Sequence, residues 1–152
     1  MKVDRVYTRN VVGTTRSASL SAAAELMRRY HVGALLVTDD PPEDANAVGF
    51  ITDRDVVVQA VAKGLDTREV TVGSVMTPVV GSISDKSDLH DALEMMRTAG
   101  VRRLVVTRGD GQVAGMLSMD DVIDGIAVDI TSLTQLVKSE VERERDQLDA
   151  MA

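Results

Sequence analysis

Two stretches of the chain, residues 20–30 and 88–99, carry apolar side chains every three or four positions, and each leads into a short apolar run. Apolar residues at every third or fourth position are typical of an amphipathic helix, and a short continuous apolar run is typical of a buried strand. Ser19 or Ser21 is a suitable N-cap for the earlier helix, and residues 31–33 end it. We therefore predict helices over 20–30 and 88–99, and strands over 34–38 and 103–107.

A second strand and a second helix follow in each half of the chain. Residues 48–51 and 112–117 have the composition of strands, and the later one comes after a tight turn at 109–111. Thr52 is positioned to cap a helix over 53–62, with Gly64 ending it. The corresponding later helix begins at Met119. Residues 39–47, which include two prolines and five acidic or amide side chains, are predicted to form a solvated loop.

These elements recur because the chain is an internal repeat. Residues 20–38 match residues 89–107 at an offset of 69, which pairs Val32 with Val101. Residues 49–56 match 115–122 at an offset of 66, so the loop in the first copy is three residues longer. Neither copy is long enough to form a stable folded unit alone. We predict an α/β fold in which the two copies pair about a pseudo-twofold axis and form two related clefts.

The segments outside the repeats have different patterns. In the connector over 64–78, Pro78 favours an extended lead into the second copy. Residues 130–151 carry apolar side chains with charges between them, which indicates a terminal amphipathic helix. Its apolar positions are Leu133, Leu136, Val137, Val141 and Leu148. The predicted divisions are residues 1–64, 65–78, 79–128 and 129–152.

Composition narrows the function classes. The 152 residues are 44% hydrophobic and 27% charged, values ordinary for a globular protein, and none is Cys. Disulfides, thiolate zinc sites and cysteine nucleophiles are therefore excluded. A net charge of −7, a pI of about 4.8 and few aromatic residues argue against nucleic-acid binding. No apolar run is long enough to span a membrane and no signal peptide is evident, so we expect a cytoplasmic protein.

The sequence Gly-apolar-apolar-Thr/Ser-x-x-Asp stands at the second strand-to-helix junction of both copies. It places Thr52 with Asp55, and Ser118 with Asp121. A hydroxyl at a helix N-terminus suits a phosphate, and an ionised carboxylate one turn later accepts hydrogen bonds from two neighbouring hydroxyls, such as a ribose diol. The same spacing is also the capping box, which needs no ligand. Both interpretations stay open from the residues alone.

Together, the duplicated helix–strand pattern, this junction motif and the Val-Met-Thr-Pro sequence at 75–78 resemble a pair of CBS domains, the cystathionine-β-synthase-type regulatory module. The resemblance extends from about Val6 to Ala127. It implies two tandem β-α-β-β-α repeats that bind AMP, ADP, ATP, NAD or S-adenosylmethionine in the clefts between them. It also implies association of two such pairs into a homodimer.

Carried over to this chain, the resemblance implies specific ligand contacts. Asp55 and Asp121 would hold ribose hydroxyls, and Thr52 and Ser118 would contact phosphate. Basic phosphate ligands are expected at Arg102 and Arg103. The apolar residues implied to flank adenine are Val11, Val12, Val80 and Ile83.

The first copy departs from this pattern, since Gly33 and Ala34 stand where the second has the two arginines. We therefore expect one site to be weaker or to favour a less charged ligand. Arg54 is expected to supply a cation on that side, where the second copy has Asp120.

No motif of a catalytic loop, nucleophile elbow or metalloprotease is present, so we expect no enzyme activity and no metal or required cofactor. His31 and His90 stand alone, and methionines at helical spacing, such as Met27 and Met96, are interpreted as core residues. Our leading hypothesis is a nucleotide-sensing module that acts on an effector protein in trans or through its own oligomeric state. The alternative is a ligand-independent dimerisation scaffold.

Overall fold

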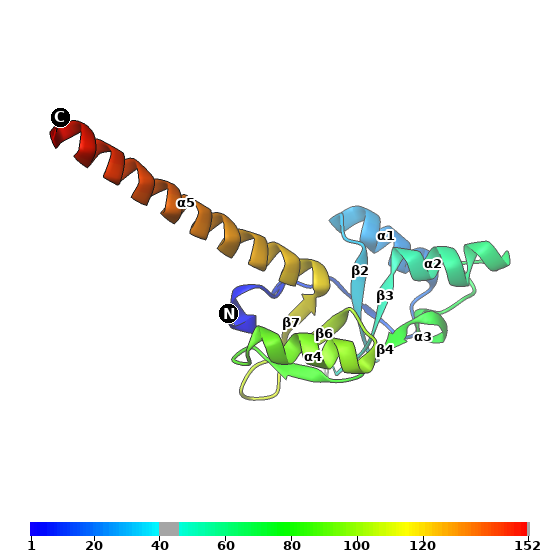
Figure 1. Ribbon diagram of the computed structural model, residues 1–152. Coiled ribbons are helices and arrows are strands. Elements are labelled where there is room, and N and C mark those ends of the chain that lie inside the picture. The colour runs from blue at the N-terminus through cyan, green and yellow to red at the C-terminus, as the bar shows by residue number, and fades with distance from the viewer. Residues whose placement is uncertain (40–45, 152) are drawn as a thin grey trace.

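Two small β-sheets packed against each other form the centre of the molecule (Figure 1). The computed structural model describes residues 1–39 and 46–151. The predicted loop over 39–47 therefore falls mostly outside the described residues. Each copy of the repeat supplies one sheet and the helices that cover its outer face, which confirms the predicted α/β architecture.

The first copy builds a four-stranded sheet in the order β1-β2-β3-β4. Strand β1 pairs in parallel with β2, β2 pairs antiparallel with β3, and β3 pairs antiparallel with β4. The elements of the first copy are β1 (Gly13–Thr15), α1 (Leu20–Tyr30), β2 (Ala34–Thr38), β3 (Ala47–Thr52), α2 (Asp53–Gln59) and the 3₁₀ turn η3 (Val61–Lys63). The segment that follows adds α3 (Val72–Val75) and the edge strand β4 (Thr77–Pro78).

The second copy repeats this arrangement in a sheet of order β5-β6-β7. Its pairing is again parallel and then antiparallel, with equivalent residues in register. Its elements are β5 (Ser82–Ser84), α4 (Leu89–Ala99), β6 (Arg103–Thr107), β7 (Val113–Ser118) and α5 (Met119–Met151), and the 3₁₀ turn η1 (Val3–Arg5) packs beside them.

Alternating side chains of the central strands enter different cores. Leu35 and Val37 of β2 are fully buried beneath α1, whereas Leu36 between them faces the other sheet. Val105 of β6 and Phe50 of β3 join Leu36 in this central layer. Because both faces of these strands are buried, their sequences are continuously apolar rather than alternating.

The chain crosses between the two sheets twice. We call residues 7–12 and 76–81 the crossing segments. Thr8 is bonded to Met116 of β7 through both backbone groups, at 2.9 and 3.0 Å, before the chain reaches β1 in the first sheet. Pro78 lies in β4 against Gly49 of β3 before the chain reaches β5 in the second sheet. Each copy therefore begins on the sheet of the other.

The crossings explain why the junction motif starts with glycine. A Cβ at Gly49 would lie 2.8 Å from the Thr77 carbonyl oxygen, and one at Gly115 would overlap the Thr8 carbonyl oxygen and the Tyr7 ring. Only a residue without a side chain lets the crossing segment lie flat against the strand at these positions.

One predicted helix is shorter in the structure. The helix expected over 53–62 ends at Gln59, because Ala60 leaves helical geometry and the chain continues as η3 to Gly64, whose φ is 68°. Three consecutive valines at 56–58 favour the helix only weakly. The extended lead predicted at Pro78 is confirmed, since Pro78 lies in the strand β4, and the connector before it contains the short helix α3. The predicted divisions at residues 64, 78 and 128 stay a prediction.

The terminal segment is one unbroken helix with the helix that follows β7. α5 runs from Met119 to Met151 and leaves the body of the molecule as a straight rod (Figure 1). Its apolar side chains beyond Val122, from Ile123 to Met151, are 42–85% exposed. Among the described residues, no helix has the length and apolarity that crossing a membrane requires.

Replacing Gly115 with alanine tests the crossing. We expect Gly115→Ala to lower the free energy of unfolding by about 1–3 kcal/mol, because the added methyl group displaces the Thr8 backbone. Urea denaturation measures the loss. Gly109→Ala is the matched control, since a Cβ there meets no atom within 4 Å. Equal stability of the two variants would contradict the close contact.

Candidate functional site

Two pockets lie on either side of the central layer, and each is built by both copies of the repeat. We call the pocket containing Thr52 and Asp55 the Thr52 cleft, and the pocket containing Ser118 and Asp121 the Ser118 cleft. Their volumes are about 360 and 300 Å³ respectively. These volumes lie at the small end of the range of about 300–1,000 Å³ typical of small-molecule sites.

The two clefts are related by the internal repeat. The hydroxyl–carboxylate pair of one copy faces the beginning of the first long strand of the other copy. Thr52 and Asp55 thus face Arg102 and Arg103, and Ser118 and Asp121 face Gly33 and Ala34. A crossing segment closes each pocket, with Thr77 in the Thr52 cleft and Thr8 in the Ser118 cleft.

Both junction motifs form complete capping boxes. Asp55 Oδ2 accepts hydrogen bonds from the Thr52 backbone N–H at 2.9 Å and from the Thr52 hydroxyl at 2.8 Å. The Asp55 N–H donates to Thr52 Oγ1 at 3.1 Å. Ser118 and Asp121 make the same three bonds at 2.8, 2.6 and 3.2 Å. The capping interpretation is therefore realised at both junctions, and each uses one carboxylate oxygen, Oδ2.

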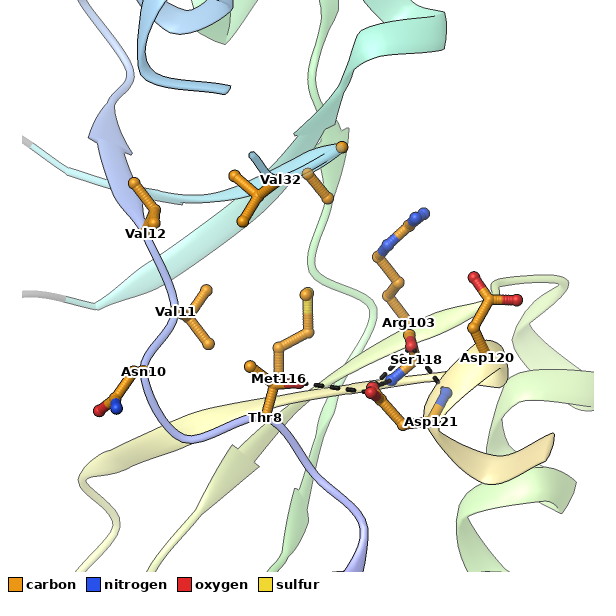
Figure 2. A pocket seen from close by; sticks show the side chains of 12 residues that line it. Thr8, Asn10, Val11, Val12, Val32, Arg103, Met116, Ser118, Asp120 and Asp121 are labelled. Carbon is orange, nitrogen blue, oxygen red and sulfur yellow. Dashed lines mark hydrogen bonds between the residues drawn. The ribbon is translucent and has the colours of Figure 1, made fainter. Parts of the chain in front are cut away.

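The other carboxylate oxygen differs between the clefts. Asp121 Oδ1 accepts a hydrogen bond from the Thr8 hydroxyl at 3.3 Å (Figure 2). No donor within residues 1–39 and 46–151 is bonded to Asp55 Oδ1. Oδ1 of Asp55 thus has no hydrogen-bond donor among the described residues, whereas Oδ1 of Asp121 already accepts one hydrogen bond, from Thr8.

The charges of the two clefts are opposite. Arg54, Arg102 and Arg103 accompany Asp55 in the Thr52 cleft. The Ser118 cleft contains Asp120 and Asp121, with Arg103 as its one cation among the described residues. An anion is therefore favoured in the Thr52 cleft and disfavoured in the Ser118 cleft.

The predicted role of Arg54 is wrong in one respect. We expected Arg54 to compensate for Gly33 and Ala34, but it lies in the cleft that already holds Arg102 and Arg103. The reason is the crossing, which sets the Thr52–Asp55 motif of the first copy opposite the strand of the second. The Ser118 cleft, which has Arg103 as its one cation among the described residues, is the one that also receives Asp120.

The arginines are differently restrained. Nη2 of Arg102 lies 3.7 Å from Oδ1 of Asp120, and both side chains are more than 70% exposed. Such a pair contributes little to stability, so Arg102 is available to a ligand. Arg103 is half-buried and projects from the second sheet toward the first copy (Figure 2).

The four apolar residues expected around adenine are divided. Val11 and Val12 line the Ser118 cleft (Figure 2). Ile83 is buried in the core of the second copy, and Val80 is 53% exposed; neither is among the residues that line the Thr52 cleft. The apolar walls of that cleft come instead from Phe50, Pro78 and Val101.

Several lining residues were missed by sequence reasoning. Thr8 and Thr77 are equivalent at the offset of 69, and Phe50 and Met116 at the offset of 66. The repeat alignment could have revealed each pair, because residues at equivalent positions line equivalent clefts. Among the described residues, no three His, Asp or Glu side chains gather as metal ligands would.

This chain matches a known protein family and several known proteins. The CBS-domain family model matches the chain twice, over residues 3–61 and 72–128. The chain belongs to the CBS-domain family. Hypoxic response protein 1 of Mycobacterium tuberculosis is 30% identical over 104 residues, which cover 68% of this chain and 70% of that protein.

A second relative is longer than this chain. An uncharacterized protein of Methanopyrus kandleri is 25% identical over 123 residues, and the match spans 81% of this chain but only 61% of that protein. Among solved structures, the CBS-domain protein PAE2072 from Pyrobaculum aerophilum, complexed with AMP, superposes with a TM-score of 0.67 at 24% identity. The superposition covers 80% of this chain and 89% of that one, and it shows the shared fold.

The capping boxes can be tested without any ligand. We expect Thr52→Ala to lower the free energy of unfolding by about 0.5–2 kcal/mol, because it removes the acceptor for the Asp55 N–H. Thermal or urea unfolding measures the loss. Asp88→Ala is the control, since Asp88 occupies the N-cap of α4 without a capping hydrogen bond and its ion pair with Lys2 is exposed, so the loss should be less than about 0.5 kcal/mol.

Proposed function

We propose that this CBS pair is a regulatory module, without catalytic activity, that binds an adenine nucleotide in its Thr52 cleft. AMP, ADP, ATP and NAD share the ribose and phosphate that this cleft suits. The observation that carries the proposal is the juxtaposition of three arginines with a carboxylate that has a free oxygen. Two copies of the repeat supply these groups, so only the folded pair assembles them.

Each part of a nucleotide has a suitable partner. Asp55 Oδ1 accepts a hydrogen bond from a ribose hydroxyl, and the guanidinium groups of Arg102 and Arg103 donate to phosphate oxygens. The Thr52 hydroxyl donates to Asp55 in this structure and would have to rotate before it donates to a ligand. Pro78 and Val101 offer the adenine ring an apolar surface.

Binding would be communicated because the cleft joins the two copies. A nucleotide held by Asp55 of one copy and by Arg102 of the other favours the relative orientation of the sheets in which both contacts form. A ligand shifts a conformational equilibrium only by such differential contacts. The output would be an altered contact with an effector protein in trans or an altered oligomeric state.

Asp55→Asn tests the proposal. We expect nucleotide affinity to fall at least tenfold, because the amide loses the charge of the carboxylate and one of its acceptor oxygens. Thermal-shift titrations with AMP, ADP, ATP, NAD and S-adenosylmethionine measure affinity. A ligand at 100 times its dissociation constant stabilises the wild type by about 2.7 kcal/mol, or roughly 5–10 °C.

Asp121→Asn is the matched control, because it makes the same change in the cleft that disfavours anions. The unliganded stability of both variants is measured first, since each aspartate also caps a helix. An absence of any shift with ligand-free wild-type protein at millimolar nucleotide would contradict the proposed function.

A second candidate function is a self-associating scaffold, and the exposed stripe on α5 favours it. Ile126, Ile130, Leu133, Val137 and Val141 lie within one side of the helix, at 42–66% exposure. A second copy of α5 offers an equally apolar stripe of the same spacing. Burial between two such helices is the simplest way to remove this surface from water. The homodimer implied by the sequence resemblance is part of this proposal.

Leu133→Glu tests the self-association. We expect it to weaken the dimer at least tenfold, because it introduces a charge into the centre of the stripe, and sedimentation equilibrium measures the change. Gln135→Glu adds a charge on the opposite side of the helix and should leave the dimer unchanged. A wild-type chain that stays monomeric at high micromolar concentration would contradict the scaffold without affecting nucleotide binding.

A further inference from the structure

Arg103 lies between the two clefts and lines both of them. It begins β6, next to the fully buried Leu104, so its backbone is fixed while its side chain extends between the two copies (Figure 2). Its equivalent in the first copy is Ala34, which lines the Ser118 cleft and has no polar group. Of these two equivalent positions, only one therefore carries a guanidinium group.

The Arg103 guanidinium forms no ion pair with a carboxylate of residues 1–39 or 46–151. Its Nε is buried and has no hydrogen-bond partner among the described residues. A buried donor left unpaired is unfavourable, and for a charged group the cost is larger. An anionic ligand in either cleft would offset the positive charge of the guanidinium.

The two clefts depend on Arg103 to different degrees. Without it, the Thr52 cleft still contains Arg54 and Arg102. The Ser118 cleft is left with Asp120 and Asp121, so a phosphate there would face two carboxylates and no cation. An anion in the Ser118 cleft therefore requires Arg103, and an anion in the Thr52 cleft competes for it.

We propose that Arg103 couples the two clefts negatively, so that an anionic nucleotide in the Thr52 cleft weakens the binding of a second one in the Ser118 cleft. The inference rests on the proposed nucleotide site. Binding draws the guanidinium toward the Thr52 cleft and leaves the Ser118 cleft acidic. The coupling is reciprocal and acts on the phosphate, so adenosine, which has none, binds without it.

Isothermal titration calorimetry of the 152-residue chain with AMP measures the coupling. Asp55→Asn weakens the Thr52 cleft at least tenfold, so its titration at AMP concentrations below the dissociation constant of that weakened cleft gives the affinity of the Ser118 cleft when Arg103 is free. We expect this affinity to exceed that of the second binding step in the wild type by roughly tenfold, within the 5- to 150-fold range common for coupled sites. Adenosine should show no such difference.

Ala34→Arg is the gain-of-function variant, because it supplies the Ser118 cleft with its own guanidinium. We expect two AMP molecules to bind per chain with no more than twofold coupling. Arg54→Ala is the control, since Arg54 lines the Thr52 cleft and is not among the residues that line the Ser118 cleft. Alone it should weaken the first binding step, and combined with Asp55→Asn it should leave the affinity of the Ser118 cleft unchanged.

The outcomes separate the two proposals. AMP binding at two independent clefts in the wild type overturns the coupling and leaves the nucleotide site in place. One binding event in the wild type and none in Asp55→Asn also overturns it. The Ser118 cleft then binds no AMP, so Arg103 has no binding there to weaken. Failure of AMP and adenosine to bind the wild type overturns both proposals.

Discussion

The close contact between each crossing segment and the last strand of the opposite copy is the constraint on which the rest of this structure depends. At Gly49 and Gly115 the backbone of one segment lies directly against the other, with no room for a side chain. These contacts place β4 at the edge of the first sheet and Thr8 at the edge of the second. They also bring Val3 and Tyr7 into the core of the second copy, and Val72 into that of the first. Neither core is complete without residues from beyond its own repeat.

The clefts inherit their composition from this crossing. Each cleft combines the junction motif of one copy with a strand of the other. A substitution in the strand of one copy therefore changes the cleft that contains the junction motif of the other copy. The arginines of the second copy therefore reinforce the Thr52–Asp55 motif, whereas Gly33 and Ala34 add no charge beside Ser118 and Asp121, so Arg103 is the one cation of that cleft among the described residues. A duplicated sequence thus yields two unlike sites from only a few differences.

The local elements could be predicted from the sequence, because apolar spacing and caps are properties of neighbouring residues. Ser19 caps α1, and the strands β2 and β6 have the predicted bounds. The early end of α2 at Ala60 could not be foreseen, since Ala60 is completely buried in a core formed by distant residues. Membership of the CBS-domain family was also predictable, from the combination of the repeat and its junction motif.

The distribution of the predicted site residues between the two clefts was harder to predict from the sequence, since it depends on which copy lies opposite which junction motif. The junction motif predicts two pairs, Thr52 with Asp55 and Ser118 with Asp121, and the structure places each pair in its own cleft. From the sequence we expected Arg54 on the side poor in cations, and the fold places it on the other side. Ile83 has the apolar character of a ring contact, but its β5 position directs it into the core.

The continuity of α5 has a mechanical consequence. The Ser118–Asp121 cap lies at the first turn of this 33-residue helix, whose remainder extends beyond the body. At 1.5 Å per residue the helix is roughly 50 Å long. A tilt of only about 5° at its base displaces its far end by roughly 4 Å. The helix is thus a lever arm, and a change too small to disturb either core becomes, at residue 151, a movement as large as the width of a side chain.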